Sequence, residues 1–153
     1  MLLGPAGVGK RSCARAAAEE CRRPLYTVAA SQLASSGAEL EAAVAAVVST
    51  CCRWGAFLLM EHVESLCTGG GGREGADLAV LRMMEEHCGY AAGGDGGPRV
   101  VFVTASHLDA SSPFLGSSSA IFLPFQSLSG PSLQDMWALA IAGVLAEASA
   151  GNE

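Results

Sequence analysis

The sequence is poor in basic residues, and this scarcity argues against several classes of partner. Its 153 residues carry 9 lysines and arginines against 15 acidic residues, which gives a net charge of −6. Lys10 is the only lysine, and no lysine or arginine follows Arg99. Because neutralisation of phosphate groups dominates the affinity for nucleic acids and contributes to the affinity for anionic membranes, we expect neither a nucleic acid nor a membrane as a partner.

Long apolar runs and paired cysteine motifs are also missing. The longest apolar run, at 54–60, is far too short to cross a bilayer, and the first residues lack the basic start and apolar centre of a signal peptide. The six cysteines show no Cys-x-x-Cys spacing, and four of them fall in apolar helical stretches. We therefore expect buried thiols rather than disulfides or a metal site, and a soluble intracellular protein.

The sequence does contain a regular alternation of strand-like and helix-like segments. Aromatic, β-branched or continuous apolar stretches predict strands at 1–3, 25–30, 56–60, 99–106 and 120–125. Helix-forming stretches with apolar residues on one face predict helices at 10–22, 37–54, 76–88 and 131–148. This alternation predicts a single α/β domain built on a parallel sheet with right-handed crossovers.

A glycine-rich loop, "GPAGVGK", joins the first predicted strand to the first predicted helix. Such a loop presents backbone N–H groups to phosphate oxygens, and the helix N-terminus and a following lysine add positive charge. The alternative is a tight turn that needs glycine for its backbone alone, but the chain's one lysine lies on the required position. The predicted nucleotide-binding residues are Gly4, Pro5, Ala6, Gly7, Val8, Gly9, Lys10, Arg11 and Ser12.

Three motifs in sequence order resemble those of the AAA+ ATPases, specifically their AAA-type core. "LLGPAGVGK" is similar to the Walker A motif, "WGAFLLMEHVES" to the Walker B strand and "VVFVTASHLDA" to the sensor-1 strand. The resemblance implies a three-layer P-loop NTPase sandwich at 1–128, with an incomplete first strand, followed at 129–153 by the start of a truncated helical lid. It also implies ATP and Mg²⁺ as cofactors and assembly into an AAA-type oligomer.

The metal position of the Walker A motif departs from the family pattern. Arg11 stands where the family has a Ser or Thr whose hydroxyl binds Mg²⁺, and a guanidinium cannot bind a cation. Ser12 does not replace that hydroxyl, because the next residue of a helix points about 100° away. Arg11 either lies along the phosphates as a substitute cation or is a solvated arginine without a role.

The Walker B and sensor positions depart as well. Glu61 takes the place of the usual Asp as a Mg²⁺ ligand, and His62 takes the place of the catalytic Glu. An imidazole can act as a general base, but its reach differs from that of a carboxylate. In an alternative register, Glu61 is the base and Met60 occupies the metal position. Ser106 replaces the sensor-1 Asn and can donate only one hydrogen bond.

The arginine finger of the family has no counterpart, since no arginine follows Arg99. A different subunit of a hetero-oligomer would have to supply one in trans. We expect an ATP-binding core in which ATP hydrolysis is weak or lost. The first alternative is a non-catalytic pseudo-ATPase that serves as an interaction module in a larger AAA assembly. The second is an active ATPase in which His62 and a partner's arginine replace the missing groups.

Overall fold

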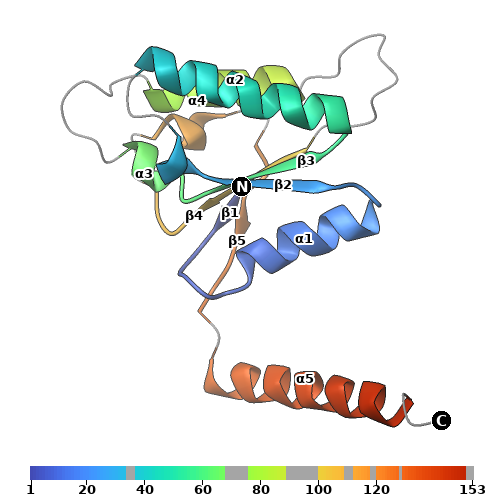
Figure 1. Ribbon diagram of the computed structural model, residues 1–153. Coiled ribbons are helices and arrows are strands. Elements are labelled where there is room, and N and C mark those ends of the chain that lie inside the picture. Colours follow the sequence, from blue (N-terminus) through green and yellow to red (C-terminus); the bar gives the residue numbers. More distant parts are fainter. Residues whose placement is uncertain are drawn as a thin grey trace.

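Five short parallel strands form one sheet in the computed structural model of the protein (Figure 1). The structure describes residues 1–33, 37–67, 76–88, 100–108, 112–117, 120–127 and 129–150. The strands are β1 (Leu2–Leu3), β2 (Leu25–Ala29), β3 (Phe57–Glu61), β4 (Val101–Ala105) and β5 (Leu123–Pro124). Their order across the sheet is β2-β3-β4-β1-β5, and every pairing is parallel. The predicted parallel sheet is therefore confirmed.

Helices cover both faces of this sheet and complete the three layers (Figure 1). The α-helices are α1 (Lys10–Glu20), α2 (Gly37–Trp54), α3 (Glu64–Cys67), α4 (Ala76–Cys88) and α5 (Gly130–Ala150). Two 3₁₀ helices, η1 (Ala30–Gln32) and η2 (Pro113–Gly116), follow β2 and β4. Helices α2 and α4 lie on one face, and α1 lies on the other. The two 3₁₀ helices and the one-turn helix α3 are too short to show a periodic pattern in the sequence.

Helix α1 ends two residues earlier than the sequence predicts. The backbone N–H of Arg23 donates to the Ala18 carbonyl and that of Arg22 to the Glu19 carbonyl, each at 2.9 Å. These two bonds form a Schellman motif, in which the residue after the C-cap takes a left-handed conformation. Arg22 is that residue, with a φ of 52°. The helix thus stops before Pro24, and the chain turns directly into β2.

Strand β3, between β2 and β4, is buried along its whole length because both faces of the sheet are covered. Leu58 and Met60 pack under α2, and Met60 also belongs to the core that α4 contributes. Leu59, from the opposite face of the strand, packs with Leu2 and Ala14 under α1. This strict alternation decides which side chains of β3 can reach the loop that precedes α1.

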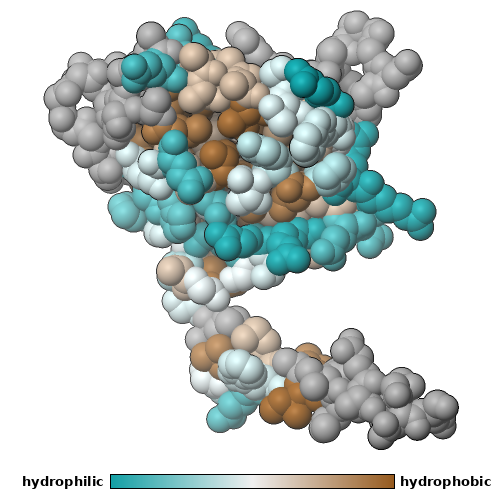
Figure 2. Space-filling model, viewed as in Figure 1, coloured by the Kyte–Doolittle hydropathy of each residue, from teal (hydrophilic) through white to brown (hydrophobic). Residues whose placement is uncertain are grey.

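Helix α5 lies apart from the sheet and its covering helices (Figure 1). Its described side chains, those of 130–139 and 141–142, are all exposed. They include apolar residues, several of which appear as brown atoms on this helix in Figure 2. The largest of them are Leu133, Met136, Trp137, Leu139 and Ile141. Among the described residues, no helix has the length and apolar character needed to cross a membrane.

The cysteines follow the prediction of buried thiols only in part. Cys51 is buried and Cys13 is half-buried, but Cys21 and Cys52 are exposed. Cys21 lies just beyond α1, and Cys52 lies about 100° around α2 from its buried neighbour. All four are thiols. The side chains of the other two cysteines, at 67 and 88, lie outside the described part of the structure.

Candidate functional site

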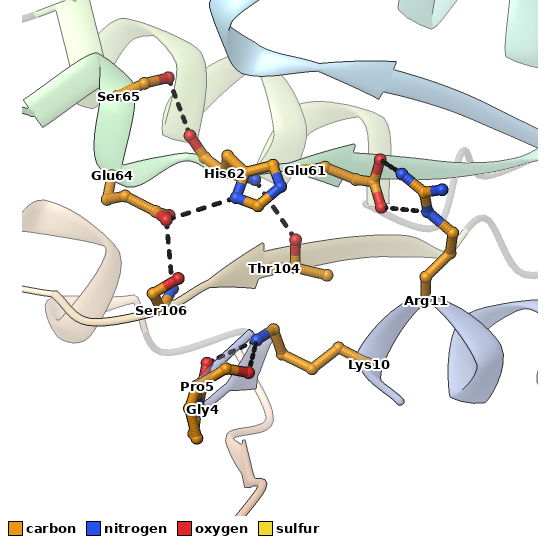
Figure 3. A network of polar contacts seen from close by, with 10 residues as sticks. All are labelled: Gly4, Pro5, Lys10, Arg11, Glu61, His62, Glu64, Ser65, Thr104 and Ser106. Atoms are coloured by element: carbon orange, nitrogen blue, oxygen red, sulfur yellow. Dashed lines mark hydrogen bonds and ion pairs between the residues drawn. The ribbon is translucent and has the colours of Figure 1, made fainter. Parts of the chain in front are cut away.

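The order of the strands brings three chain segments together at one edge of the sheet. Strand β4 lies between β1 and β3, so the carboxyl ends of these three parallel strands are neighbours. The loop 4–9 follows β1, His62 to Glu64 follow β3, and Ser106 follows β4. Figure 3 shows their side chains converging from these elements. In open α/β sheets this edge is where ligands bind.

The loop after β1 has a backbone that requires glycine. Gly4, Gly7 and Gly9 have φ angles of 149°, 79° and 92°, which side-chain-bearing residues rarely adopt. The N–H of Gly4 donates to the Ala105 carbonyl at 3.2 Å and so ties the start of the loop to β4. The middle of the loop, from Pro5 to Gly7, is exposed. The loop is thus anchored at its start and open to solvent along its middle.

Positive charge gathers at the point where this loop enters α1. Gly9 is the N-cap of the helix and offers no side chain to its N–H groups, and the first turn contains no acidic residue. The partial positive charge of the helix N-terminus is therefore not compensated by the helix itself. The Lys10 ammonium lies across the loop and donates to the carbonyls of Gly4 at 2.5 Å and Pro5 at 2.7 Å (Figure 3).

Arg11 forms an ion pair with Glu61, which lies at the end of β3. Its Nε donates to Oε1 at 2.7 Å and its Nη2 to Oε2 at 2.6 Å, so both carboxylate oxygens are used. The Glu61 side chain is 8% exposed and that of Arg11 is 64% exposed. The hydrogen bonds from Arg11 outweigh burial and hold the pKa of Glu61 below its ordinary value, while Glu61 raises the pKa of Arg11. Neither role considered for Arg11 from the sequence includes this pair.

This donor set does not fit Mg²⁺. The ion is bound by oxygen ligands, and the position of the family's hydroxyl holds a guanidinium instead. The second expected ligand, Glu61, already uses both of its oxygens to bind Arg11. Across the residues that the structure describes, no three His, Cys, Asp or Glu side chains converge on a common point. The predicted role of Glu61 as a metal ligand is therefore not supported by the geometry.

The alternative register of the Walker B strand places Met60 in the metal position. Met60 is fully buried and belongs to the core beneath α2 and α4, together with residues such as Val44 and Val80. Glu61 lies on the opposite face of β3, on the side of α1, where it contacts Arg11. The structure thus brings Glu61, and not Met60, to the loop.

His62 stands at a strained point of the backbone directly after β3. Its φ of 59° is unusual for a residue other than glycine and costs roughly 1–2 kcal/mol. Its N–H donates to Thr104 Oγ1 at 3.3 Å, and its carbonyl accepts from Ser65 Oγ at 2.8 Å. The imidazole is 60% exposed, with Nδ1 3.5 Å from Glu64 Oε1. These contacts aim the side chain toward Glu64 (Figure 3).

Glu64 connects the two predicted catalytic residues, His62 and Ser106. Its Oε1 accepts from the Ser106 N–H at 3.3 Å and faces His62. Burial raises the pKa of Glu64, but hydrogen bonds from its own N–H, from Ser106 and from His62 outweigh burial and bring the pKa below its ordinary value. Its other oxygen, Oε2, is buried and has no hydrogen-bond partner in the described part of the chain.

Glu64 is the site residue that the sequence reasoning missed. The signal was present in the motif "MEHVES", because the Walker B pattern typically carries a further acid two positions after the catalytic Glu. The predicted residues Lys10, Arg11, Glu61, His62 and Ser106 all lie at the same sheet edge (Figure 3). Ser12 lies exposed in the first turn of α1.

Comparison with known proteins identifies the family of this site and fold. The sequence model of the "ATPase family associated with various cellular activities (AAA)" matches residues 1–125. The chain belongs to the AAA family. Its resemblance to the AAA-type core, inferred from three motifs, is thereby confirmed. A search of curated protein sequences gave no match.

The fold of this AAA domain is shared with solved structures. One is the AAA domain of FIGL-1 in complex with ADP, which superimposes with a TM-score of 0.64 at 19% sequence identity. The match covers 93% of this chain and 47% of that structure, so the chain spans about half the length of its structural neighbour. The predicted P-loop NTPase fold is confirmed by this likeness.

Proposed function

We propose that this AAA domain binds ATP at the loop 4–10 and hydrolyses it slowly or not at all. The observation that carries the proposal is the convergence of an open glycine loop, an uncapped helix N-terminus and Lys10 at one sheet edge. Backbone N–H groups, the helix dipole and an ammonium are the three elements with which a protein binds phosphate. The AAA domain of FIGL-1, which shares this fold, was solved with ADP.

The first part of the proposal depends on how Lys10 responds to a ligand. The ammonium contacts two neutral carbonyls of the loop and no carboxylate among the described residues. A phosphate oxygen can replace a neutral carbonyl as acceptor and gains a charge-assisted hydrogen bond by doing so. Binding therefore requires a rearrangement of one side chain and no separation of opposite charges at this residue.

The second part concerns the steps after binding. Phosphoryl transfer requires a metal ion, a group that orients water and positive charge on the transferred phosphate. Here Arg11 and Glu61 pair with each other, and His62 faces Glu64. No arginine follows Arg99, and loss of an arginine finger costs about 10³–10⁵ in rate. Each requirement of the reaction is thus weakened, which supports slow or absent hydrolysis.

The proposal extends to the organisation of the protein. We retain the division into a nucleotide-binding core at 1–128 and the start of a lid at 129–153, which is supported by the separate position of α5 in Figure 1. Within an AAA assembly, an arginine from a different subunit would complete the site. We also infer an intracellular location, because the four described cysteines are thiols.

A titration of the purified protein with a fluorescent ATP analogue tests binding. We expect saturable binding that is lost in Lys10→Ala. The matched control is Arg15→Ala, which removes an exposed cation from the same helix and leaves the loop intact. No binding by the unaltered protein would refute the proposal and would favour the alternative of a non-catalytic interaction module.

Phosphate release measured at saturating ATP tests the second part. We expect turnover close to the background of a Lys10→Ala sample. His62→Ala and Glu64→Gln are compared with the unaltered protein, since these two side chains could still orient water. Turnover well above background that disappears in either variant would show that the site hydrolyses ATP and would identify the residue responsible.

A further inference from the structure

We propose that the Arg11–Glu61 pair makes nucleotide binding by this domain independent of Mg²⁺. This inference depends on the proposed nucleotide-binding function and goes beyond it by assigning the pair a role at that site. The argument concerns the two residues that stand in the family's metal positions and the charges that surround them.

The geometry of the pair is that of a strong, specific contact. The guanidinium offers two parallel N–H groups, and the carboxylate accepts both at 2.7 and 2.6 Å. Bidentate pairs of this kind are short, directional and charge-assisted. Fifty residues separate the partners in sequence, so the contact also joins the first turn of α1 to the end of β3.

The position of each partner makes the pair difficult to replace by a metal ion. Glu61 ends a strand that is buried along its length, and its side chain is 8% exposed. A metal that bound its carboxylate would have to displace the Arg11 guanidinium. Because Arg11 belongs to the first turn of α1, the displaced guanidinium would still lie close to the bound divalent cation. Like charges that lie close together repel strongly in a partly buried site. Mg²⁺ is therefore disfavoured twice, by occupied oxygens and by a fixed neighbouring charge.

For nucleotide binding, the pair also replaces the metal ion in one role, which is to offset the negative charge of the carboxylate. A lone carboxylate at the edge where phosphate binds would repel the nucleotide, and Mg²⁺ normally offsets negative charge at such sites. Here the Arg11 guanidinium offsets the Glu61 charge directly. Lys10 and the uncapped N-terminus of α1 then provide positive charge for the phosphates. The cations of the site are thus supplied by the chain.

Calorimetric titration with ADP, which cannot be hydrolysed at a γ-phosphate, tests the inference on the unaltered protein. One sample contains excess MgCl₂ and the other contains excess EDTA. We expect the Kd values of the two samples to agree within about twofold, whereas a tightening of about tenfold or more with Mg²⁺ overturns the inference. Absence of binding in both samples would overturn the proposed function as well, so the two failures are distinguishable.

Two variants test whether the pair is the cause. Arg11→Thr supplies the family's hydroxyl and releases Glu61, and we expect ADP binding by this variant to tighten with Mg²⁺ by about tenfold. Arg15→Thr removes the exposed arginine one turn further along α1 and should remain insensitive to Mg²⁺, as the unaltered protein is. Equal affinities with Mg²⁺ and EDTA in a folded Arg11→Thr protein, checked by circular dichroism, would overturn the role of the pair.

Discussion

Replacing Gly4 by alanine is expected to destabilise the protein through a direct clash between the loop and Phe125, the residue that follows β5. A Cβ at position 4 would lie 2.1 Å from the carbonyl oxygen of Phe125 and 2.9 Å from its Cβ. Ordinary contact begins at 3.4 Å, so the two segments must separate by roughly 1.3 Å. The movement strains the hydrogen bond from the Phe125 N–H to the Leu3 carbonyl, which is 2.6 Å long and holds β5 against β1.

The magnitude follows from two contributions. Overpacking of this kind costs typically about 1–3 kcal/mol. The φ of 149° adds backbone strain for any L-residue, roughly 1–3 kcal/mol. Alanine also reduces the entropy of the unfolded chain, which recovers about 0.4–1 kcal/mol. The net loss in the free energy of unfolding is expected at about 1–6 kcal/mol, a large part of the stability of a small domain.

Urea denaturation followed by circular dichroism measures this loss, and two other glycines serve as controls. Gly7 has a φ of 79° but open space around its Cβ position, so Gly7→Ala should show the backbone strain without a clash. The strain of about 1–2 kcal/mol, less the same gain from the unfolded chain, gives a net cost below about 2 kcal/mol. Gly116 has open space and no positive φ, so Gly116→Ala should stabilise the protein by about 0.4–1 kcal/mol through the unfolded chain alone. If Gly4→Ala costs no more than Gly7→Ala, the close contact between Gly4 and Phe125 is refuted.

Three further changes have expected outcomes. Arg22→Gly should stabilise the protein by about 0.5–1 kcal/mol, because glycine adopts the left-handed conformation of the α1 C-terminus without strain. Leu59→Ala should cost about 2–5 kcal/mol, because it leaves a cavity in the core beneath α1. Because the folded-state pKa of Glu61 is lowered, its contribution to stability is present at neutral pH and is lost as the pH falls below about 4.3. Arg11→Met should therefore be less stable than the unaltered protein at neutral pH, and the difference should shrink in acid.

Each of these expectations has a contradicting result in urea denaturation. A loss of stability in Arg22→Gly would mean that the Arg22 side chain contributes more than its strained backbone costs. A cost below about 1 kcal/mol in Leu59→Ala would mean that the core closes around the deletion. A difference between Arg11→Met and the unaltered protein that stays constant from pH 7 to acid would show that Glu61 does not titrate through this pair.

The extent to which the sequence determined the structure depends on the range of the interactions involved. The glycine loop, the order of strands and helices and the parallel sheet could be predicted because they depend on local propensity and on the periodicity of apolar residues. The early end of α1 was missed because Arg22, and not a glycine, takes the left-handed position. The one-turn helix α3 was missed because four residues are too few to show a pattern.

At the site, sequence and tertiary structure made different contributions. The motifs identified Lys10, Arg11, Glu61, His62 and Ser106 one by one, since each stands at a fixed offset from a glycine or an apolar run. The contacts between these residues could not be predicted from the motifs, because residues far apart in sequence meet only when the sheet assembles. The pairing of Arg11 with Glu61 and the link from Ser106 to Glu64 arise in this manner. The sequence determined which charged groups lie near the glycine-rich loop, and the packing of β3 against α1 decided that two of them neutralise each other.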